Sequence, residues 1–222
     1  MSFISVFDVI GPNMVGPSSS HTAGACAIAY LAQKMNNGIL KNVTFTLYGS
    51  FAKTYRGHGT DRALLGGIMG FSTDDIRIRD SFSIAGEQGI DFSFVPDETD
   101  TDVHHNTVDI RMENADGRVM TVRGESTGGG KVRIVRINQV QVDFTGEFNA
   151  VIIIQQDKPG VAAHITKCLG DQNVNIAFMR IFRESKGETA YTIVESDGRL
   201  PDDITPRLMA NPHVHDVMLI QN

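Results

Sequence analysis

Residues 156–183 read QDKPGVAAHITKCLGDQNVNIAFMRIFR, and this stretch decides the fold of the C-terminal half. The Asp-Lys-Pro-Gly turn ends where a helix can begin. Four apolar residues then recur at helical spacing: Val161, Ile165, Cys168 and Leu169. The segment 173–182 that follows is apolar and bounded by polar residues, which predicts a strand.

The segments around this stretch extend the pattern on both sides. FNAVIIIQQ (148–156) predicts a strand before the turn, and ETAYTIVES (188–196) predicts one after the polar turn RESKG. A helix near 202–210 and a strand at 214–221 complete the order β-α-β-β-α-β. This is the ferredoxin-like order, with both helices on one face of the sheet. The fold class is therefore α+β, with a C-terminal domain at 148–222.

This half resembles the ACT domains, small regulatory modules that commonly bind amino acids. The resemblance rests on the Asp-x-Pro-Gly turn, the apolar helix after it and the N-x-N-I entry into the next strand. It implies that Asp157, Gly160 and Asn175 bind a regulatory ligand, and that ACT domains meet in a self-associated protein. The residues alone leave a simpler alternative open, in which Gly160 only makes the turn and Asn175 only caps a loop.

The first half, residues 1–145, shows a mixed α/β pattern. SSHTAGACAIAYLAQKMN (19–36) and HGTDRALLGGIMG (58–70) predict helices, and KNVTFTLYG (41–49) predicts a half-buried strand. TVDIRM (107–112), RVMTVRGES (118–126) and KVRIVRINQVQV (131–142) predict consecutive strands of an antiparallel meander. Residues 71–106 give no clear pattern.

Composition excludes several classes of partner. The 222 residues carry a formal net charge of −6, with Lys and Arg scattered, which argues against nucleic acid or an anionic membrane. No apolar run approaches the length of a membrane span. The N-terminal MSFISVFDVIG lacks the features of a signal peptide. With two cysteines, Cys26 and Cys168, far apart in sequence, we expect a reduced, cytoplasmic protein.

GPSSSHTAG (16–24) gathers four hydroxyls around one imidazole. Hydroxyls and helix-start amides can hold a carboxylate, and histidine titrates near neutrality. The alternative is a serine-rich helix cap with a solvated histidine. A serine hydrolase is disfavoured because the stretch is not a G-x-S-x-G elbow, and because the adjacent Ser20 and His21 are not expected to pair as nucleophile and base.

Three further motifs stand in order along the first half: GSFAKTYRGHGTDRALLGG (49–67), HHNTVDI (104–110) and ESTGGGKVRI (125–134). Together with GPSSSHTAG and the ACT-like half, they resemble the β subunit of the iron–sulfur-dependent L-serine dehydratases over the whole chain. Two positions depart from that pattern. Gly24-Ala25 stands where Gly-Pro is frequent, and His105 stands where a proline is frequent.

The resemblance implies an enzyme that converts L-serine to pyruvate and ammonia. It implies a [4Fe–4S] cluster held by a separate α subunit, because clusters need several cysteine thiolates and this chain has two. It implies His21, His58 and Asp61 as catalytic residues, with Asp61 or Thr60 holding His58. The implied substrate-binding residues are Ser18, Ser19, Ser20, Thr22, Thr60, Asn106, Thr107, Gly128, Gly129 and Gly130. The alternative to a catalytic role for His58 and Asp61 is a structural one, in which they form a buried polar network that supports the helix.

Three other functions remain as alternatives. The first half also resembles the allosteric-substrate-binding domain of some phosphoglycerate dehydrogenases, which suggests a non-catalytic serine sensor with two ligand-binding domains. A zinc or iron hydrolase would use His21, His58, His104 and His105, but their spacing is a weak metal signal. A pyridoxal-phosphate enzyme would need a phosphate loop, and TGGG stands between strands rather than before a helix.

Overall fold

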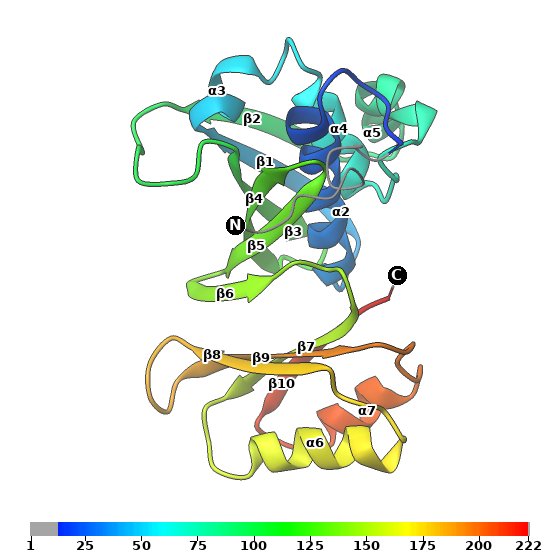
Figure 1. Cartoon of the computed structure of the whole chain (residues 1–222), viewed down its shortest axis with the longest axis vertical. Helices are drawn as coiled ribbons and strands as arrows, with labels where there is room; N and C mark the ends of the chain where they lie inside the picture. The colour runs from blue at the N-terminus through cyan, green and yellow to red at the C-terminus, as the bar shows by residue number, and fades with distance from the viewer. Residues whose placement is uncertain (1–12, 222) are drawn as a thin grey trace, which may run out of the picture. The chain divides into compact units, whose positions relative to one another are not determined.

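The computed structural model describes residues 13–221, and the N-terminal stretch for which no signal peptide is expected lies outside them. The chain divides into two compact units, Met1–Val135 and Arg136–Asn222. The domain limits expected from the sequence, 1–145 and 148–222, stay a prediction. Both units are α+β, as expected (Figure 1).

A six-stranded sheet has the order β2-β1-β3-β4-β5-β6; its first four strands in this order belong to the first unit, the limit between the units falls within β5, and β6 follows that limit. Its strands are β1 (Leu40–Tyr48), β2 (Asp91–Asp97), β3 (Thr107–Asn114), β4 (Val119–Gly128), β5 (Lys131–Ile137) and β6 (Val140–Phe144). β1 runs parallel to β2 and antiparallel to β3, and β3 and β4 form an antiparallel hairpin. The order β3 to β6 follows the chain, which confirms the predicted meander.

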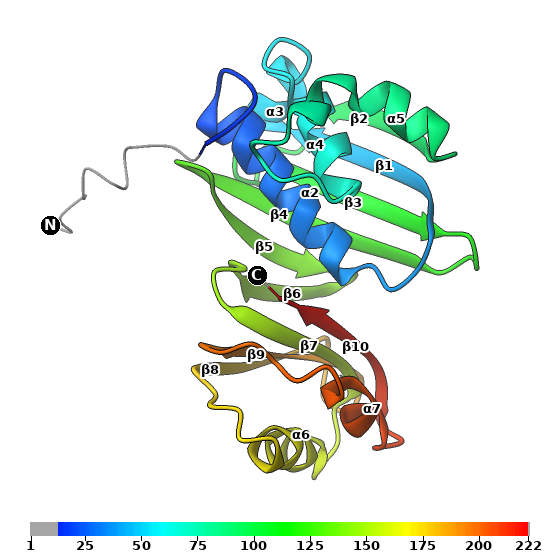
Figure 2. The ribbon, with the colours of Figure 1, turned by 90° about the vertical axis from the view of Figure 1, so that its right-hand side faces the viewer.

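Two packed helices cover one face of this sheet (Figure 2). A π-helical turn, η1 (Ser19–Ala23), leads into α2 (Gly24–Met35), and α4 (Thr60–Ile68) packs along α2. Small residues on α2 and α4 let the two helices approach closely, since a Cβ on Gly67 would lie 2.3 Å from the carbonyl oxygen of Cys26. The predicted helices at 19–36 and 58–70 are thus confirmed.

Several short elements of the first unit were not predicted. They are α3 (Gly49–Thr54), the 3-10 helix η2 (Ile76–Asp80), α5 (Ser81–Glu87) and the edge strand β2. The segment 131–142, predicted as one strand, is two strands. Asn138 breaks it with a φ of +52°, because asparagine tolerates the left-handed conformation of a tight turn.

The second unit has the predicted order β-α-β-β-α-β. Its elements are β7 (Asn149–Gln156), α6 (Val161–Asp171), β8 (Phe178–Arg183), β9 (Thr189–Ser196), α7 (Ile204–Met209) and β10 (Val214–Ile220). The sheet order β10-β7-β9-β8 is the ferredoxin-like one, and both helices lie on the same face (Figure 1). Its core joins the inward residues of β7 to α6 and α7, including Ile153, Ile165 and Leu208. β8 begins later than the predicted 173 because Asn173, at φ +56°, still belongs to the turn after α6.

Candidate functional site

His21 lies in the π-helical turn η1, where a serine caps the start of the helical segment. The side chain of Ser18 accepts a hydrogen bond from the backbone N–H of His21 at 3.1 Å. The expected serine cap is therefore present, and the histidine is half-buried rather than fully solvated. The alternative of a serine-rich cap thus describes Ser18 but does not exclude a further role for the imidazole.

Hydroxyl groups contact both nitrogens of the His21 ring. Ser20 Oγ lies 2.9 Å from Nδ1, with Ser18 Oγ at 3.4 Å from the same atom. The expectation that Ser20 and His21 would not pair was wrong, because the Ser20 hydroxyl lies within hydrogen-bond distance of the His21 ring. On the other side, Ser50 Oγ lies 2.8 Å from Nε2, although Ser50 is 29 residues away in sequence.

Ser50 is held in place by a close contact between two loops. It stands in α3, directly after β1, and its backbone N–H donates to the carbonyl of His105 at 2.6 Å. Gly49 before it has φ +53°, and a Cβ there would lie 2.7 Å from the Cα of His105. Only glycine suits this position, since it combines a left-handed backbone with no room for a side chain. The sequence motifs at 49–67 and 104–110 therefore meet at this point.

His58 adjoins His21, with 4.9 Å between the ring centroids. Its backbone carbonyl accepts a hydrogen bond from the hydroxyl of Thr22 at 2.9 Å. The predicted support of His58 by Thr60 or Asp61 is not formed. His58 Nδ1 and Thr60 Oγ1 are both buried with no hydrogen-bond partner among residues 13–221, and Asp61 Oδ1 accepts the backbone N–H of Arg62 at 2.8 Å.

The surroundings of His21 favour its neutral form. Burial lowers the pKa of His21 below its usual 6.5, and the neighbouring His58 and His105 lower the pKa further. The edge of the Phe51 ring packs against the imidazole, with centroids 5.5 Å apart. A neutral imidazole near pH 7 can accept a proton, so this group is suited to act as a general base.

The remaining predicted substrate-binding residues fall into two sets. Thr22, Asn106 and Thr107 are buried, and the hydroxyls of Thr22 and Thr107 already donate to backbone carbonyls. Gly128, Gly129 and Gly130 all have positive φ and form the turn between β4 and β5. Nothing in the described part of the chain lies within 4 Å of a Cβ on Gly128, so the space beside this glycine is open, and its role in substrate binding stays a prediction.

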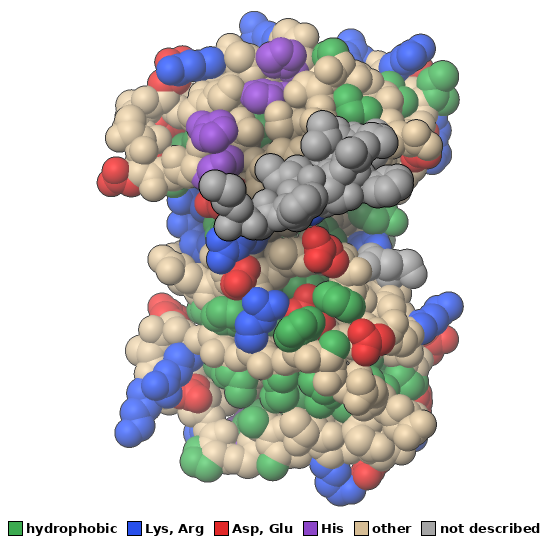
Figure 3. Space-filling view, viewed as in Figure 1, with side chains coloured by type: hydrophobic (Ala, Val, Ile, Leu, Met, Phe, Trp, Pro, Cys, Tyr) green, Lys and Arg blue, Asp and Glu red, His purple; other side chains and the backbone are tan. Residues whose placement is uncertain are grey.

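Histidine side chains gather on one face of the first unit (Figure 3). The rings of His104 and His105 lie 4.1 Å apart, and burial lowers the pKa of His104. Despite this gathering, no group of three or more His, Cys, Asp or Glu residues in the described part of the chain is arranged to hold a metal ion. The zinc or iron hydrolase therefore gains no support from the geometry.

The two cysteines do not fit an iron–sulfur cluster. Cys26 is buried in α2 with its thiol directed to the carbonyl of Phe71, and burial raises its pKa to about 12. Cys168, in α6 of the second unit, contacts the ring of His164 at 3.5 Å. Clusters require several neighbouring thiolates, so this chain's own donors cannot hold one.

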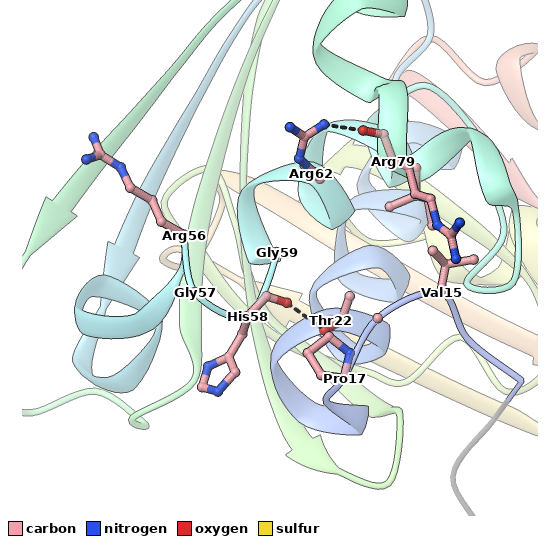
Figure 4. A pocket seen from close by; sticks show the side chains of 11 residues that line it. Val15, Pro17, Thr22, Arg56, Gly57, His58, Gly59, Arg62 and Arg79 are labelled. Atoms are coloured by element: carbon pink, nitrogen blue, oxygen red, sulfur yellow. Dashed lines mark hydrogen bonds between the residues drawn. The ribbon is translucent and has the colours of Figure 1, made fainter.

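A cavity of about 350 Å³ opens beside His58 (Figure 4). It is lined by Val15, Gly16, Pro17, Thr22, Arg56, Gly57, His58, Gly59, Arg62, Ile78 and Arg79. The cavity lies between the segment before η1, the start of α4 and η2. Of the predicted site residues, Thr22 and His58 contribute to its walls.

Of the predicted ligand-binding residues of the second unit, Asp157 and Gly160 lie before α6, whereas Asn175 lies beyond its end, toward the end of the sheet where β7 begins. Gly160 is the N-cap of α6 with φ +89°, so it also makes the turn. Asp157 accepts hydrogen bonds from the backbone of Gly187 and from Arg183, both at 3.1 Å, and these contacts lower its pKa. Asn175 is exposed in the loop before β8. Asp157 thus braces the β8–β9 turn, while Gly160 and Asn175 stay accessible.

Sequence reasoning missed Ser50, the partner of His21 Nε2. The signal was present as the Gly-Ser pair that opens the motif at 49–67. A serine–histidine pair also occurs in hydrolases, but the backbone N–H groups of Ser50 and Phe51 both donate to His105. They are therefore not free to form the oxyanion hole that acyl transfer needs.

Comparison with known proteins gives matches over both units. Residues 5–136 match the sequence model of the family described as "Serine dehydratase beta chain", and residues 150–213 match that of the ACT domain. The chain is 37% identical over 220 residues to the "Probable L-serine dehydratase, beta chain" of Bacillus subtilis, covering 99% of both chains. It is 38% identical over 209 residues to the "L-serine dehydratase, beta chain" of Peptoniphilus asaccharolyticus, covering 94% of both.

A more distant similarity links the chain to another enzyme. The D-3-phosphoglycerate dehydrogenase of Bacillus subtilis is 29% identical over 182 residues, which cover 82% of this chain and 34% of that protein. Among the helices of the described residues, none has the length and apolar character to cross a bilayer.

Proposed function

Because this chain belongs to the serine dehydratase beta chain family and carries an ACT domain, we propose that it is the β chain of an L-serine dehydratase. It acts with a separate α chain, and together they convert L-serine to pyruvate and ammonia. The α chain ligates the [4Fe–4S] cluster of the complex, since the cysteines of this chain cannot. The complex works in the cytoplasm, where free cysteines stay reduced.

One observation carries this proposal: a half-buried imidazole with a lowered pKa and a hydroxyl on each nitrogen. Dehydration of serine requires a base for the Cα proton and loss of the β-hydroxyl as water. The resulting aminoacrylate takes up water and gives pyruvate and ammonia. His21 accepts the Cα proton, while Ser20 and Ser50 fix the ring and its tautomer.

The chemistry of this chain is confined to holding the substrate and moving a proton. Within GPSSSHTAG, we assign Ser18, Ser19 and Ser20 to the substrate; Ser18 and Ser20 also contact His21, whereas the Thr22 hydroxyl donates to the His58 carbonyl. His58 stands beside His21 with an unpartnered Nδ1, which makes it the second candidate for proton transfer. The Asp61 carboxylate accepts the backbone N–H of Arg62 at the start of α4. Asp61 is therefore a weaker candidate for a catalytic role than its position in the motif suggests.

The ACT domain binds an amino acid and mediates self-association in this proposal. Gly160 opens α6 in a left-handed conformation, and the first-turn amides of a helix favour a carboxylate. Asn175 lies beyond the other end of α6, so it contacts the same ligand only where two ACT domains meet in the self-associated protein. L-serine is the proposed ligand, because an enzyme of serine breakdown gains from sensing its substrate.

A non-catalytic serine sensor is the second candidate, and the similarity to D-3-phosphoglycerate dehydrogenase favours it. In a sensor, His21 would bind an anion and move no proton. The two functions differ in one result: a sensor binds L-serine alone but adds no dehydratase activity to an α chain.

Reconstitution tests the proposal. The chain is mixed anaerobically with purified α chain, and pyruvate formation from L-serine is measured. We expect activity only from the mixture, and a fall of about 10²–10⁴-fold in kcat/KM for His21→Ala, the usual contribution of a general base. The variant must remain folded and bound to the α chain. Activity from this chain alone after iron removal, or a His21→Ala effect of only about twofold, would refute the proposal.

A further inference from the structure

Arginines surround the cavity beside His58. Arg62 comes from α4 and Arg79 from η2, and Figure 4 shows the Arg79 side chain extending toward Val15. Arg56 contributes to the wall as well, but its side chain points away from the others (Figure 4). Sequence motifs assigned no role to Arg62 or Arg79.

The positive charge at this cavity is not balanced by carboxylates. Of the described residues that line it, none is Asp or Glu. Within the described part of the chain, neither Arg62 nor Arg79 forms an ion pair. Arg62 instead donates to the backbone carbonyl of Arg79 and lies 4.9 Å from the ring centroid of Phe82. These contacts fix the Arg62 guanidinium and leave other N–H groups of its five for a ligand.

The apolar walls of the cavity strengthen the electrostatic field of these arginines. Val15, Pro17 and Ile78 are apolar, and apolar walls lower the local dielectric and focus the field of nearby charges. Gly59, the N-cap of α4, also lines the cavity, so the positive end of this nine-residue helix adds to the field. Asp61 on α4 accepts a hydrogen bond at its own helix start; burial raises its pKa, and the nearby charges of Arg62 and Arg56 act against that rise, so Asp61 offsets part of the positive charge from outside the cavity wall.

We propose that this cavity is a binding site for a small oxyanion, held by Arg62 and Arg79. The ligand group is a carboxylate or a phosphate, because the planar guanidinium matches both. The volume of about 350 Å³ suits a molecule the size of an amino acid or a phosphate ion. The cavity shares Thr22 and His58 with the site of the proposed function, but its two arginines have no role there, and its test does not depend on dehydratase activity.

Titration of the full chain tests the site. Inorganic phosphate and L-serine are each added at constant ionic strength, and binding is followed by the NMR signals of the arginine Nε–H groups and of Gly57 and Gly59. We expect saturable shifts at these signals for at least one ligand. We expect affinity at least tenfold weaker in Arg79→Gln and in Arg62→Gln.

Two control variants carry the same change elsewhere. Arg56→Gln removes the lining arginine that points away, and Arg118→Gln removes an exposed arginine paired with Asp116. Affinity should stay within twofold of the parent in both. Since Arg62 packs on Phe82, Arg62→Lys keeps a charge there should Arg62→Gln lose stability, and circular dichroism checks each fold.

Serinol, which lacks the carboxylate of serine, separates the two ligand sources. Binding of L-serine but not serinol assigns the site to a carboxylate, and binding of phosphate alone assigns it to a phosphate group. Absence of saturable binding for both phosphate and L-serine would overturn the proposal. So would equal affinity in Arg79→Gln and the parent.

Discussion

The hydroxyl of Ser50 lies 2.8 Å from Nε2 of His21 and joins two sequence motifs in one site. Ser50 is a positioning residue in the proposed function, since it touches the imidazole rather than the reacting atoms. Its hydroxyl and that of Ser20 hold the ring from opposite sides. The orientation of the ring therefore depends on a residue outside GPSSSHTAG.

Replacing Ser50 with Ala should lower kcat/KM of the reconstituted enzyme about five- to tenfold. The change removes one side-chain hydrogen bond of about 1 kcal/mol and leaves the backbone contact to His105 intact. NMR of the His21 ring nitrogens should show a mixture of tautomers, and Ser50→Thr should restore a single one. Ser83→Ala, which removes an exposed hydroxyl in α5, is the control. Unchanged ring signals in Ser50→Ala would contradict the positioning role.

The rate of the reconstituted enzyme should fall on the acid side at a pH below the usual histidine pKa of 6.5. Burial and the neighbouring His58 and His105 lower the pKa of His21, so the ring stays neutral to more acidic pH than a free histidine. Protonation removes the base, and activity is lost as pH falls through this lowered pKa. A profile of kcat/KM against pH measures the pKa of the acid limb, and NMR titration of His21 shows whether this ring is the group responsible. An acid limb above 6.5 that follows His21 would be inconsistent with this environment.

The fold of the second unit could be predicted from the sequence because β7, α6 and β9 are long and periodic, and the six-residue α7 then completes a known order of elements. The missed elements of the first unit are short or weakly patterned. α3 has six residues, and β2 contains Pro96 and alternates between exposed and half-buried residues. Such a strand is recognised only by its parallel pairing with β1, which is not a local property.

The site was predicted in part, for a similar reason. The motif identified His21, but its partner Ser50 is brought in by the fold from 29 residues away. Thr22 and Thr107 were predicted as ligand-binding hydroxyls, yet Thr22 donates to the carbonyl of His58, 36 residues away in sequence, and Thr107 donates to the carbonyl of His104 in its own turn. Whether a hydroxyl donates its hydrogen bond to a backbone carbonyl or to a ligand depends on three-dimensional contacts, which one sequence does not contain.

Replacing Asp109 with Asn should destabilise the first unit by about 2 kcal/mol. Asp109 accepts two hydrogen bonds from Arg123, at 2.6 and 2.7 Å, and one from the Tyr48 hydroxyl at 2.9 Å. Hydrogen bonds to charged groups contribute about 1.5–3 kcal/mol, and the change leaves a largely buried guanidinium without its counter-ion. Urea unfolding measures the loss.

The matched control for Asp109→Asn is Asp116→Asn. Asp116 also pairs with an arginine, Arg118, at 2.7 Å, but both side chains are more than half exposed. Exposed pairs contribute about 0–1 kcal/mol, so this variant should unfold close to the parent. Equal losses in the two variants would show that burial does not decide the energy of this pair.

Replacing Gly67 with Ala should lower stability by about 1–3 kcal/mol. The added Cβ would lie 2.3 Å from the Cys26 carbonyl oxygen and 2.9 Å from the Ala29 Cβ, so α4 must move away from α2. The midpoint of urea unfolding measures the effect. Gly86→Ala in α5 adds the same methyl group to a helix where nothing lies within 4 Å, and it should be neutral or stabilising. A stable Gly67→Ala variant would mean that the two helices adjust freely.

Replacing Asn175 with Ala should weaken L-serine binding to the ACT domain at least several-fold without changing the fold, because an exposed side chain is removed. NMR shifts of the amides at the start of α6 measure binding. Asn211→Ala, in the turn before β10, is the control. Identical L-serine affinity in Asn175→Ala and the parent would remove Asn175 from the ligand site.

The carbonyl of His105 accepts the backbone N–H groups of both Ser50 and Phe51. Deuterium should therefore enter these two amides at similar rates, since a single local opening breaks both bonds. That opening also takes the Ser50 hydroxyl away from the imidazole while Ser18 and Ser20 keep their positions. The two contacts of the imidazole thus differ in origin: the one to Ser20 is local in sequence, and the one to Ser50 depends on a single carbonyl more than fifty residues further along the chain.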